Sequence, residues 1–342
     1  MFVGIIYRCI HLIFIINLSI AFTVLTLTRL WFLVIIKGPR KIFARKIFHT
    51  VPECLTDSSL GTHGYLHLEE VRIHYVSKGS DDKPLMLLLH GFPEFWYSWR
   101  FQLKEFSKNY RVVAIDQRGY GDSDKPQGIS QYRLERMVKD VRQMIPALGY
   151  RSCTLVGHDW GGAVTWAFSG CYPNMVEKAV VLNCPHPDVF QRYLHSHWSQ
   201  FWKSWYMFFF LLPILPEIYI GLSGLKFFDI IFLGKKGGVL TGATTQEDVE
   251  AYKYLFQTFN SRTGPINYIR AGMIYGTNMQ RVTKPMLLVW GCRDIAIEKG
   301  QAELCKEYAD NLSVKYIENA SHWVQMDEPE QVNKYIREFL SN

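Results

Sequence analysis

The chain has few cysteines, and their placement excludes a disulfide scaffold. Its 342 residues contain seven, an odd number, and Cys153, Cys184 and Cys292 fall in or beside expected core strands. No spacing of cysteine and histidine fits a metal centre, because His195 and His197, two residues apart, would face different sides of a helix. We therefore expect no metal site and no cofactor.

Acidic residues are missing from the first 52 positions, where seven bases lie before Glu53. The formal charge of +7 comes wholly from this segment, because the other 31 of the 38 bases balance 31 acids. The rest of the chain is neutral, which removes the electrostatic case for a nucleic-acid partner. Internal repeats and low-complexity tracts are also absent from the sequence.

A long hydrophobic run stands near the N-terminus. Residues 10–36 are almost wholly apolar, broken mainly by Arg29, and are long enough to cross a hydrocarbon core of about 30 Å. A cleaved signal peptide would be shorter, with its bases before the run and small residues at a cleavage site. Five bases follow the run and only Arg8 precedes it, which predicts that the rest of the chain is cytosolic.

We therefore predict a membrane anchor at residues 1–36, with the lipid bilayer as a partner, and a basic linker at residues 37–61. The chain would be a single-pass protein of the endoplasmic reticulum.

Beyond the linker, expected strands and helices alternate. Residues 65–77 have the alternation of a hairpin-like pair of strands, and apolar runs then interleave with helical stretches at 99–110, 131–148 and 298–309. This order is typical of a mostly parallel sheet with flanking helices. The sequence predicts a core made of residues 62–184 and 282–342.

Residues 185–281 break this rhythm with a long, aromatic, helical stretch, which we interpret as a lid inserted between two strands. Its segment 201–220 is apolar enough to mimic a second membrane span, but four residues argue against one. The four residues are Lys203, Pro213, Pro216 and Glu217. Closing a lid over a site excludes water and shapes the substrate pocket.

Asp159 stands at the centre of a nucleophile-elbow pattern, Gly-His-Asp-Trp-Gly-Gly, between an expected strand at 153–156 and an expected helix at 163–171. Small residues are needed in this sharp turn because the backbone packs tightly there. A lone aspartate after a strand is usually a turn former or helix cap. A serine at this position would attack a carbonyl. A carboxylate, in contrast, can displace a leaving group at a strained or activated carbon and form an alkyl-enzyme ester. Hydrolysis of that ester requires a base, an orienting acid and an oxyanion hole.

These parts follow in the order nucleophile, acid, histidine that is typical of α/β-hydrolases. Asp294 lies in the loop after an expected strand at 286–290 and is the candidate orienting acid. His322 lies in the loop after the last expected strand, at 314–317, and is the candidate base. The backbone N–H groups of Phe92, in the loop after residues 85–89, and of Trp160 would form the oxyanion hole.

The loop His90-Gly91-Phe92-Pro93-Glu94, the segment 116–123, the elbow, Asp294 and His322 together resemble the α/β-hydrolase epoxide hydrolases. The resemblance covers about residues 60–342 and is closest to the membrane-anchored animal branch. It implies a mostly parallel eight-stranded sheet, an inserted helical lid and an N-terminal transmembrane helix. It also implies the opening of epoxides to vicinal diols through Asp159.

In that family, two lid tyrosines donate hydrogen bonds to the epoxide oxygen. The resemblance assigns the first to Tyr206. The second belongs to a motif that reads Gly264-Pro-Ile-Asn-Tyr-Ile-Arg270 here, so Ile269 occupies its position. Neighbouring Tyr268 is rotated by about 100° on a helix. The open outcomes are a slower enzyme with one tyrosine, a shifted helix that presents Tyr268, or lost activity; we expect retained but weakened activity, because the nucleophile, acid and base are present.

Two other functions compete with this interpretation. A haloalkane or haloacid dehalogenase would use the same triad, with Trp160 stabilising the halide, but its usual second halide ligand is replaced by Phe92. A membrane-bound scaffold could keep the fold without activity. The favoured substrate is a lipophilic epoxide, such as one derived from an unsaturated fatty acid, that enters from the bilayer through a tunnel in the lid. Its candidate lining residues are Trp202, Trp205, Phe208, Phe209 and Phe210.

Overall fold

An eight-stranded sheet forms the centre of the protein in the computed structural model, which describes residues 2–276 and 279–341, with side chains from Ile15 onward. The spatial order is β1-β2-β4-β3-β5-β6-β7-β8. The strands are β1 (Thr62–His67), β2 (Arg72–Lys78), β3 (Leu85–Leu89), β4 (Arg111–Ile115), β5 (Cys153–His158), β6 (Val176–Leu182), β7 (Met286–Gly291) and β8 (Leu312–Ile317).

The first part of the sheet is antiparallel and the rest is parallel. β2 pairs antiparallel with both β1 and β4, whereas every pair from β4 to β8 is parallel. Every residue of β3, β5 and β7 is buried, which explains why these strands read as continuous apolar runs rather than alternating ones. The predicted mostly parallel sheet of eight strands is confirmed. Because parallel strands end at one edge, the loops after β3, β5, β7 and β8 gather there.

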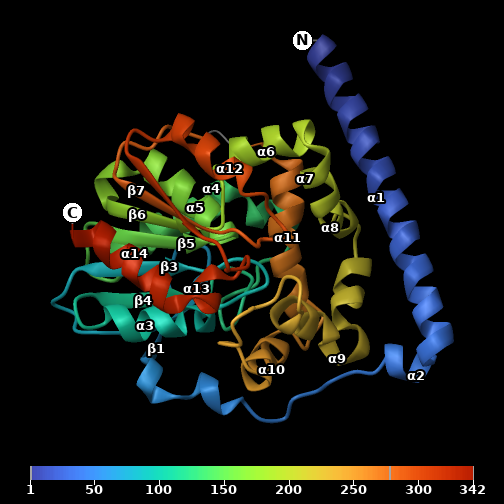
Figure 1. Cartoon of the computed structure of the whole chain (residues 1–342), viewed down its shortest axis with the longest axis horizontal. Helices are drawn as coiled ribbons and strands as arrows, with labels where there is room; N and C mark the ends of the chain where they lie inside the picture. Colours follow the sequence, from blue (N-terminus) through green and yellow to red (C-terminus); the bar gives the residue numbers. More distant parts are fainter. Residues whose placement is uncertain (1, 277–278, 342) are drawn as a thin grey trace.

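Helices cover both faces of the sheet (Figure 1). α3 packs against α14, and α4 packs against α5. The predicted helices at 99–110, 131–148 and 298–309 are longer than those observed, because 3-10 turns occupy part of each. These helices are α3 (Arg100–Phe106), α4 (Leu134–Ala147), α5 (Trp160–Cys171), α12 (Gly300–Leu304), α13 (Val324–Asp327) and α14 (Pro329–Ser341).

The segment between β6 and β7 folds as the helices that we call the lid. The stretch 201–220, apolar enough to mimic a span, is broken at Ser204 and again before Leu215. α9 is itself kinked at Leu222–Leu225, where the backbone is not helical. The lid helices are α6 (Pro187–Ser196), α7 (Trp198–Lys203), α8 (Trp205–Phe210), α9 (Leu215–Leu233), α10 (Gln246–Leu255) and α11 (Asn260–Ile274).

The N-terminal hydrophobic run forms helix α1 (Phe2–Lys37), whose part Ile15–Lys37 is the only candidate membrane span within the described residues, with a mean hydropathy of 2.0. α1 lies beside α8 (Figure 1). Phe22 is buried there, and its ring centroid lies 5.8 to 6.4 Å from those of four lid aromatics. α2 (Pro39–Ile42) and an extended linker follow α1. Residues 1, 277 and 278 of the predicted anchor and lid lie outside the described residues.

Candidate active site

Asp159 occupies a sharp turn between β5 and α5. Its φ of 50° and ψ of −120° place a non-glycine residue in a sparsely populated region of backbone space. Two glycines permit this turn. A Cβ on Gly157 would lie 2.2 Å from the carbonyl oxygen of Gly161, and one on Gly161 would lie 2.0 Å from that of Leu89. The backbone crowding therefore holds the Asp159 carboxylate out at the edge of the sheet, as in a nucleophile elbow.

Each carboxylate oxygen of Asp159 has a different neighbour. Oδ1 accepts a hydrogen bond of 2.7 Å from the Phe92 backbone N–H. Oδ2 lies 3.6 Å from His322 Nε2. Trp160 is the first residue of α5, where backbone N–H groups have no acceptor within the helix. The loop after β3 and the start of α5 therefore meet at the Asp159 carboxylate, as the sequence predicts.

Asp294 and His322 come together across the loops after β7 and β8. Asp294 Oδ2 accepts a hydrogen bond of 2.7 Å from His322 Nδ1 and one of 2.8 Å from the Asn183 amide. Its other oxygen accepts hydrogen bonds from the backbone N–H groups of Ala296 and Ile297, at 2.7 and 2.9 Å. These donors fix the carboxylate and, through it, the orientation of the His322 ring.

The electrostatic surroundings of His322 favour its protonated form. Burial of the ring opposes protonation, but the charges of Asp294 and Asp159 outweigh burial and hold the His322 pKa well above its ordinary value. Burial likewise acts to raise the pKa of Asp294, yet the charge of His322 and the hydrogen bonds from His322 and Asn183 leave that pKa lowered. In the resting site, an imidazolium therefore lies between two carboxylates.

A second buried pair supports the backbone of this site. His158 donates through Nε2 to the His322 carbonyl at 2.8 Å and through Nδ1 to the Glu94 carboxylate at 2.6 Å. Burial acts to raise the pKa of Glu94, but the charge of His158 outweighs it and lowers that pKa to about 2. Gln325 donates to the other Glu94 oxygen at 2.8 Å. Glu94 belongs to the loop that carries the family resemblance, but its role, and those of Gln325 and Asn183, could not be inferred from the sequence, because their contacts join distant segments.

A cavity of about 560 Å³ connects Asp159 and His322 with the lid. Tyr206 lines it, and no described group accepts a hydrogen bond from the Tyr206 hydroxyl. Burial, with the charges of Asp159 and Asp294, raises the pKa of Tyr206, so its hydroxyl keeps its proton. Phe92 and Trp160 also line this cavity, as do Trp202, Trp205 and Phe210 of the predicted tunnel, whereas Phe208 and Phe209 are buried in the lid.

The structure does not present Tyr268 to this cavity. Its side chain is fully buried, and its hydroxyl donates a hydrogen bond of 2.8 Å to the backbone carbonyl of Arg118. Ile269, the next residue of α11, lines the cavity instead. The suggestion that a shifted helix would offer Tyr268 as a second donor is therefore corrected: α11 keeps regular helical geometry, and one residue of rotation turns Tyr268 toward the core.

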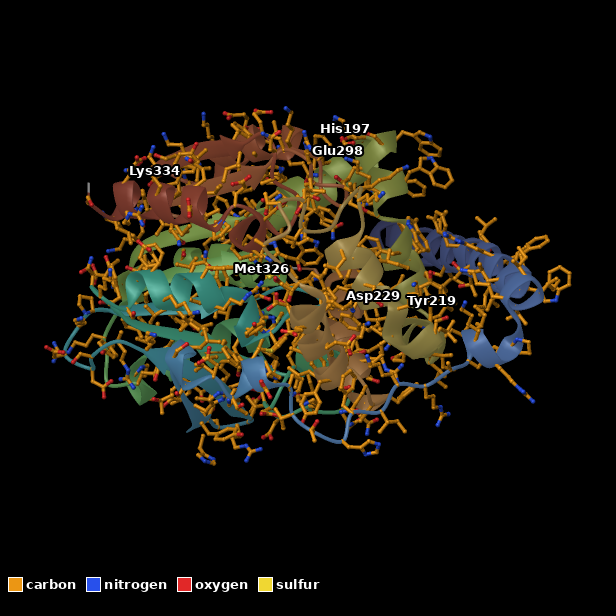
Figure 2. All side chains as sticks on the ribbon, turned by 60° about the horizontal axis from the view of Figure 1, so that its bottom comes forward. His197, Tyr219, Asp229, Glu298, Met326 and Lys334 are labelled. Atoms are coloured by element: carbon orange, nitrogen blue, oxygen red, sulfur yellow. The ribbon has the colours of Figure 1, made fainter. Side chains whose placement is uncertain are left out.

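The cavity also has lining residues that sequence reasoning did not link to the site. Arg29 and Lys37 of α1 and Lys226 of α9 line it, and Tyr219 of α9 adds a second tyrosine. Figure 2 shows Tyr219 on the side of the molecule on which α1 lies. Arg29 stands out in the sequence as the main break in the hydrophobic run, which was the available signal. The described residues contain no group of histidine, cysteine or acidic side chains that could hold a metal ion.

Known proteins similar to this chain agree on one family. A sequence model of the alpha/beta hydrolase fold matches residues 84–213. Epoxide hydrolase 4 of Homo sapiens is 44% identical over 314 residues, which span 89% of this chain and 86% of that protein. Epoxide hydrolase 1 of Caenorhabditis elegans is 46% identical over 81% of this chain and 70% of that protein.

A solved structure extends this agreement to the fold. The crystal structure of an epoxide hydrolase from Bacillus megaterium in complex with an inhibitor has a TM-score of 0.73 and 34% identity to this chain. It covers 82% of this chain and 100% of the bacterial one. The chain therefore belongs to the epoxide hydrolases of the α/β-hydrolase fold, and it is an enzyme that hydrolyses epoxides.

Proposed function

We propose that the enzyme opens lipophilic epoxides through a covalent ester on Asp159. The observation that carries this mechanism is that the two carboxylate oxygens have different neighbours. Oδ1 accepts a hydrogen bond from the Phe92 N–H, while Oδ2 faces His322. Oδ2 attacks an epoxide carbon, the ring C–O bond breaks, and Tyr206 gives its proton to the oxygen that leaves the carbon. Tyr206 supports this role because its protonated hydroxyl faces the cavity with no partner of its own.

The second half of the reaction hydrolyses the ester. Formation of the ester removes the negative charge of Asp159, one of the two charges that raise the His322 pKa. His322 therefore loses its proton more readily after the first step and can accept one from water at Nε2. The hydroxide attacks the carbonyl carbon of the ester, and the N–H groups of Phe92 and Trp160 stabilise the oxyanion. The bond between the Asp159 carbonyl carbon and the substrate oxygen breaks, the carboxylic acid formed on Asp159 gives its proton to that oxygen, and the diol leaves. The proton that His322 released after the first step passes through solvent to the Tyr206 phenolate.

The lining of the cavity supports an amphiphilic substrate. The loops at the sheet edge and α8 contribute mostly aromatic side chains, whereas α1 and α9 contribute Arg29, Lys37 and Lys226, none of which forms an ion pair within the described residues. An arginine inside a membrane span normally faces a protein interior or a water-filled cavity. We propose an epoxide in the middle of a long apolar chain whose carboxylate end reaches Arg29.

We also propose that α1 is a membrane anchor of the endoplasmic reticulum with the enzyme on the cytosolic side. The predicted division into anchor (1–36), linker (37–61), core (62–184 and 282–342) and lid (185–281) belongs to this proposal. Its support is the apolar outer surface of α1, where Val24, Leu25, Trp31 and Ile36 are exposed while Phe22 packs on the lid. Protease treatment of sealed microsomes should degrade the enzyme; full protection would reverse the orientation.

A single turnover in ¹⁸O-water tests the covalent mechanism. With enzyme in excess, the first diol should contain unlabelled oxygen from Asp159, and only later turnovers should release label. Label in the first diol would mean direct attack by water and would remove the ester from the mechanism.

The substrate class has its own test. The Arg29→Gln variant should raise KM for a long-chain epoxide with a free carboxylate by roughly tenfold, about 1.4 kcal/mol. Turnover of the corresponding methyl ester should not change, because its end carries no charge. An equal effect on acid and ester would show that Arg29 does not bind the carboxylate.

The two competing functions have lost support. Among halide-stabilising groups, the cavity provides Trp160, but the loop residue that lines it is Phe92, which cannot donate through its side chain. The inactive scaffold has no support from a site in which the Asp159, His322 and Asp294 side chains meet.

A further inference from the structure

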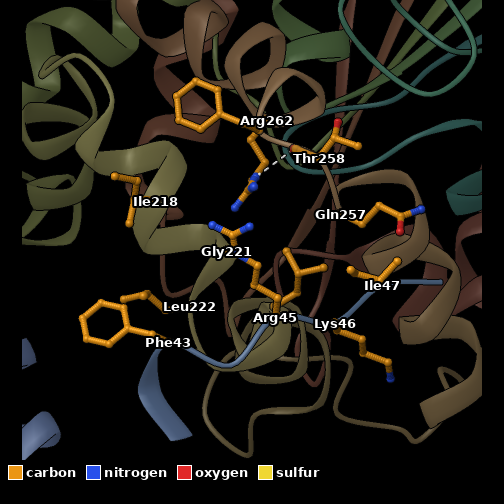
Figure 3. Close-up of a pocket in the computed structure, with 12 residues that line it drawn as sticks. Phe43, Arg45, Lys46, Ile47, Ile218, Gly221, Leu222, Gln257, Thr258 and Arg262 are labelled. Carbon is orange, nitrogen blue, oxygen red and sulfur yellow. Dashed lines mark hydrogen bonds between the residues drawn. The ribbon is translucent and has the colours of Figure 1, made fainter. Parts of the chain in front are cut away.

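A second cavity of about 440 Å³ lies between the linker and the lid, apart from the catalytic residues. The linker contributes Phe43, Arg45 and Ile47, and α9 contributes Ile218 and Leu222. Opposite them, Arg262 of α11 reaches into the cavity (Figure 3). One wall is therefore apolar, and two arginines supply charge.

Arg262 is held rigidly in this cavity. The residue is only 9% exposed, and its Nε and Nη1 donate to the carbonyl oxygens of Thr258 and Glu217 at 2.9 and 2.8 Å. The passage past α9 exists because residue 221 is glycine, since a Cβ there would lie 1.7 Å from Arg262 Nη1. The Glu217 carboxylate forms its ion pair with Arg270, at 2.7 Å, and not with Arg262, although its charge still acts on Arg262.

Arg45 brings a second positive charge to the same place. Figure 3 shows the guanidinium groups of Arg45 and Arg262 turned toward each other. Neighbouring Lys46 pairs with Glu250, so that carboxylate is already engaged. In the part of the chain that the structure describes, neither arginine forms an ion pair with a carboxylate. Burial lowers the pKa of Arg262, and the charge of Arg45 adds to this effect, while the charge of Glu217 opposes it.

We propose that this cavity binds a phosphate group, with the headgroup of a membrane phospholipid as its source. A guanidinium carries several N–H donors that fit phosphate oxygens. The N–H groups of Arg262 that the Thr258 and Glu217 carbonyls leave free, together with those of Arg45, can donate to one tetrahedral phosphate. The apolar wall of Phe43, Ile218 and Leu222 provides a surface for the acyl chains of the same lipid.

The position of the site suits a membrane lipid. The cavity is formed by the basic linker that directly follows the anchor helix, and basic segments beside a membrane span attract anionic lipids. The linker also meets the kink of α9, where the Gly224 N–H donates to the Ala44 carbonyl at 2.9 Å. Leu222 lines both cavities, so a lipid here would hold the linker against a lid segment that borders the catalytic cavity.

The test compares lipid binding by the full-length enzyme and two matched variants. Arg45→Gln removes a charge that makes no hydrogen bond within the described residues, so the fold should tolerate it. Arg40→Gln is the control, because Arg40 is an exposed base of the same linker that does not line the cavity. Each protein is placed in nanodiscs of phosphatidylcholine with or without phosphatidate, and the lipid retained after detergent exchange is measured by native mass spectrometry.

We expect the wild type and Arg40→Gln to retain phosphatidate and Arg45→Gln to retain roughly tenfold less, about 1.4 kcal/mol. Without ligand, Arg45→Gln should have a higher Tm than the wild type, because the repulsion from Arg262 is gone. A purely structural role for Arg45 would instead lower Tm. Equal retention by wild type and Arg45→Gln, or a lower Tm of the ligand-free variant, would overturn the proposal.

Inorganic phosphate in detergent distinguishes the two sources of the group. A rise in Tm with phosphate that depends on Arg45 supports the phosphate site, and a further rise with phosphatidate supports the lipid source. A rise with phosphate but none with phosphatidate would overturn the lipid source. Epoxide turnover is not used as a readout, so the result is independent of the proposed mechanism.

Discussion

Replacing Ile269 by tyrosine should accelerate ring opening, because it adds a hydroxyl to the cavity that holds Asp159 and Tyr206. Ile269 is 1% exposed to solvent but lines that cavity. A tyrosine at this position of α11 extends from the same backbone site into open volume. The cavity of about 560 Å³ has room for the larger ring.

The size of the effect follows from the worth of one donor to a developing oxyanion, about 10²- to 10³-fold in rate, or about 2.7 to 4 kcal/mol. A larger side chain in a packed site lowers the free energy of unfolding by about 1 to 3 kcal/mol, and we expect a loss of this size here. Ile269→Phe is the matched control, since it adds the ring without the hydroxyl. We expect Ile269→Tyr to alkylate at least tenfold faster than Ile269→Phe, with similar Tm for both.

Stopped-flow tryptophan fluorescence is the assay, because Trp160 lines the cavity next to Asp159 and should report formation of the proposed ester. Tyr206→Phe should then slow the wild type more than it slows the Ile269→Tyr variant, in which a second donor remains. If Ile269→Tyr and Ile269→Phe alkylate at the same rate, the added hydroxyl does not reach the epoxide oxygen. The idea that position 269 limits this enzyme would then be wrong.

Three further predictions follow from the site. His322→Gln should accumulate the alkyl-enzyme, seen as a mass increase equal to the substrate; an unmodified mass after full substrate exposure would contradict His322 as the base. Tyr268→Phe should lower the free energy of unfolding by about 1 kcal/mol, because the hydrogen bond to the Arg118 carbonyl is lost, and kcat/KM should not change. A large loss of kcat would mean that Tyr268 takes part in the reaction. Because the folded pKa of His322 is raised, its imidazolium contributes stability that is complete below about pH 6.5, the pKa of the unfolded chain, and is lost as pH rises through the folded value. The Tm of the wild type should therefore fall as pH rises through the folded pKa of His322. The Tm of His322→Gln should not show this pH-dependent fall.

The core strands and the triad could be predicted because their signals are local. The run at residues 85–89 coincides with β3, and the strand expected at 286–290 differs from β7 by one residue, since strands buried on both faces must be continuously apolar. Asp159 directly follows β5, and Asp294 and His322 lie in the short loops after β7 and β8. Parallel strands then bring their loops to one edge, so the order along the chain was enough to expect the three side chains together.

Helix ends and the direction of lid side chains could not be predicted in the same way. The helix expected at 298–309 is divided into α12 and a 3-10 turn, which a hydrophobic period cannot distinguish. For Tyr268 and Ile269 the sequence left three outcomes open. The choice between them depends on the rotation of α11 about its axis, which is set by packing against the core.

The sequence by itself determined the chemistry: a carboxylate at a nucleophile elbow, an acid and a base in the order of the family, and an apolar run with one arginine in it. The tertiary structure decided what those residues meet. It turned Tyr268 to the Arg118 carbonyl, brought Arg29 to the cavity of Asp159, and set Arg45 against Arg262. The physical reason is that local sequence specifies backbone geometry and residue type, whereas contacts between distant segments follow from how helices and loops pack in three dimensions.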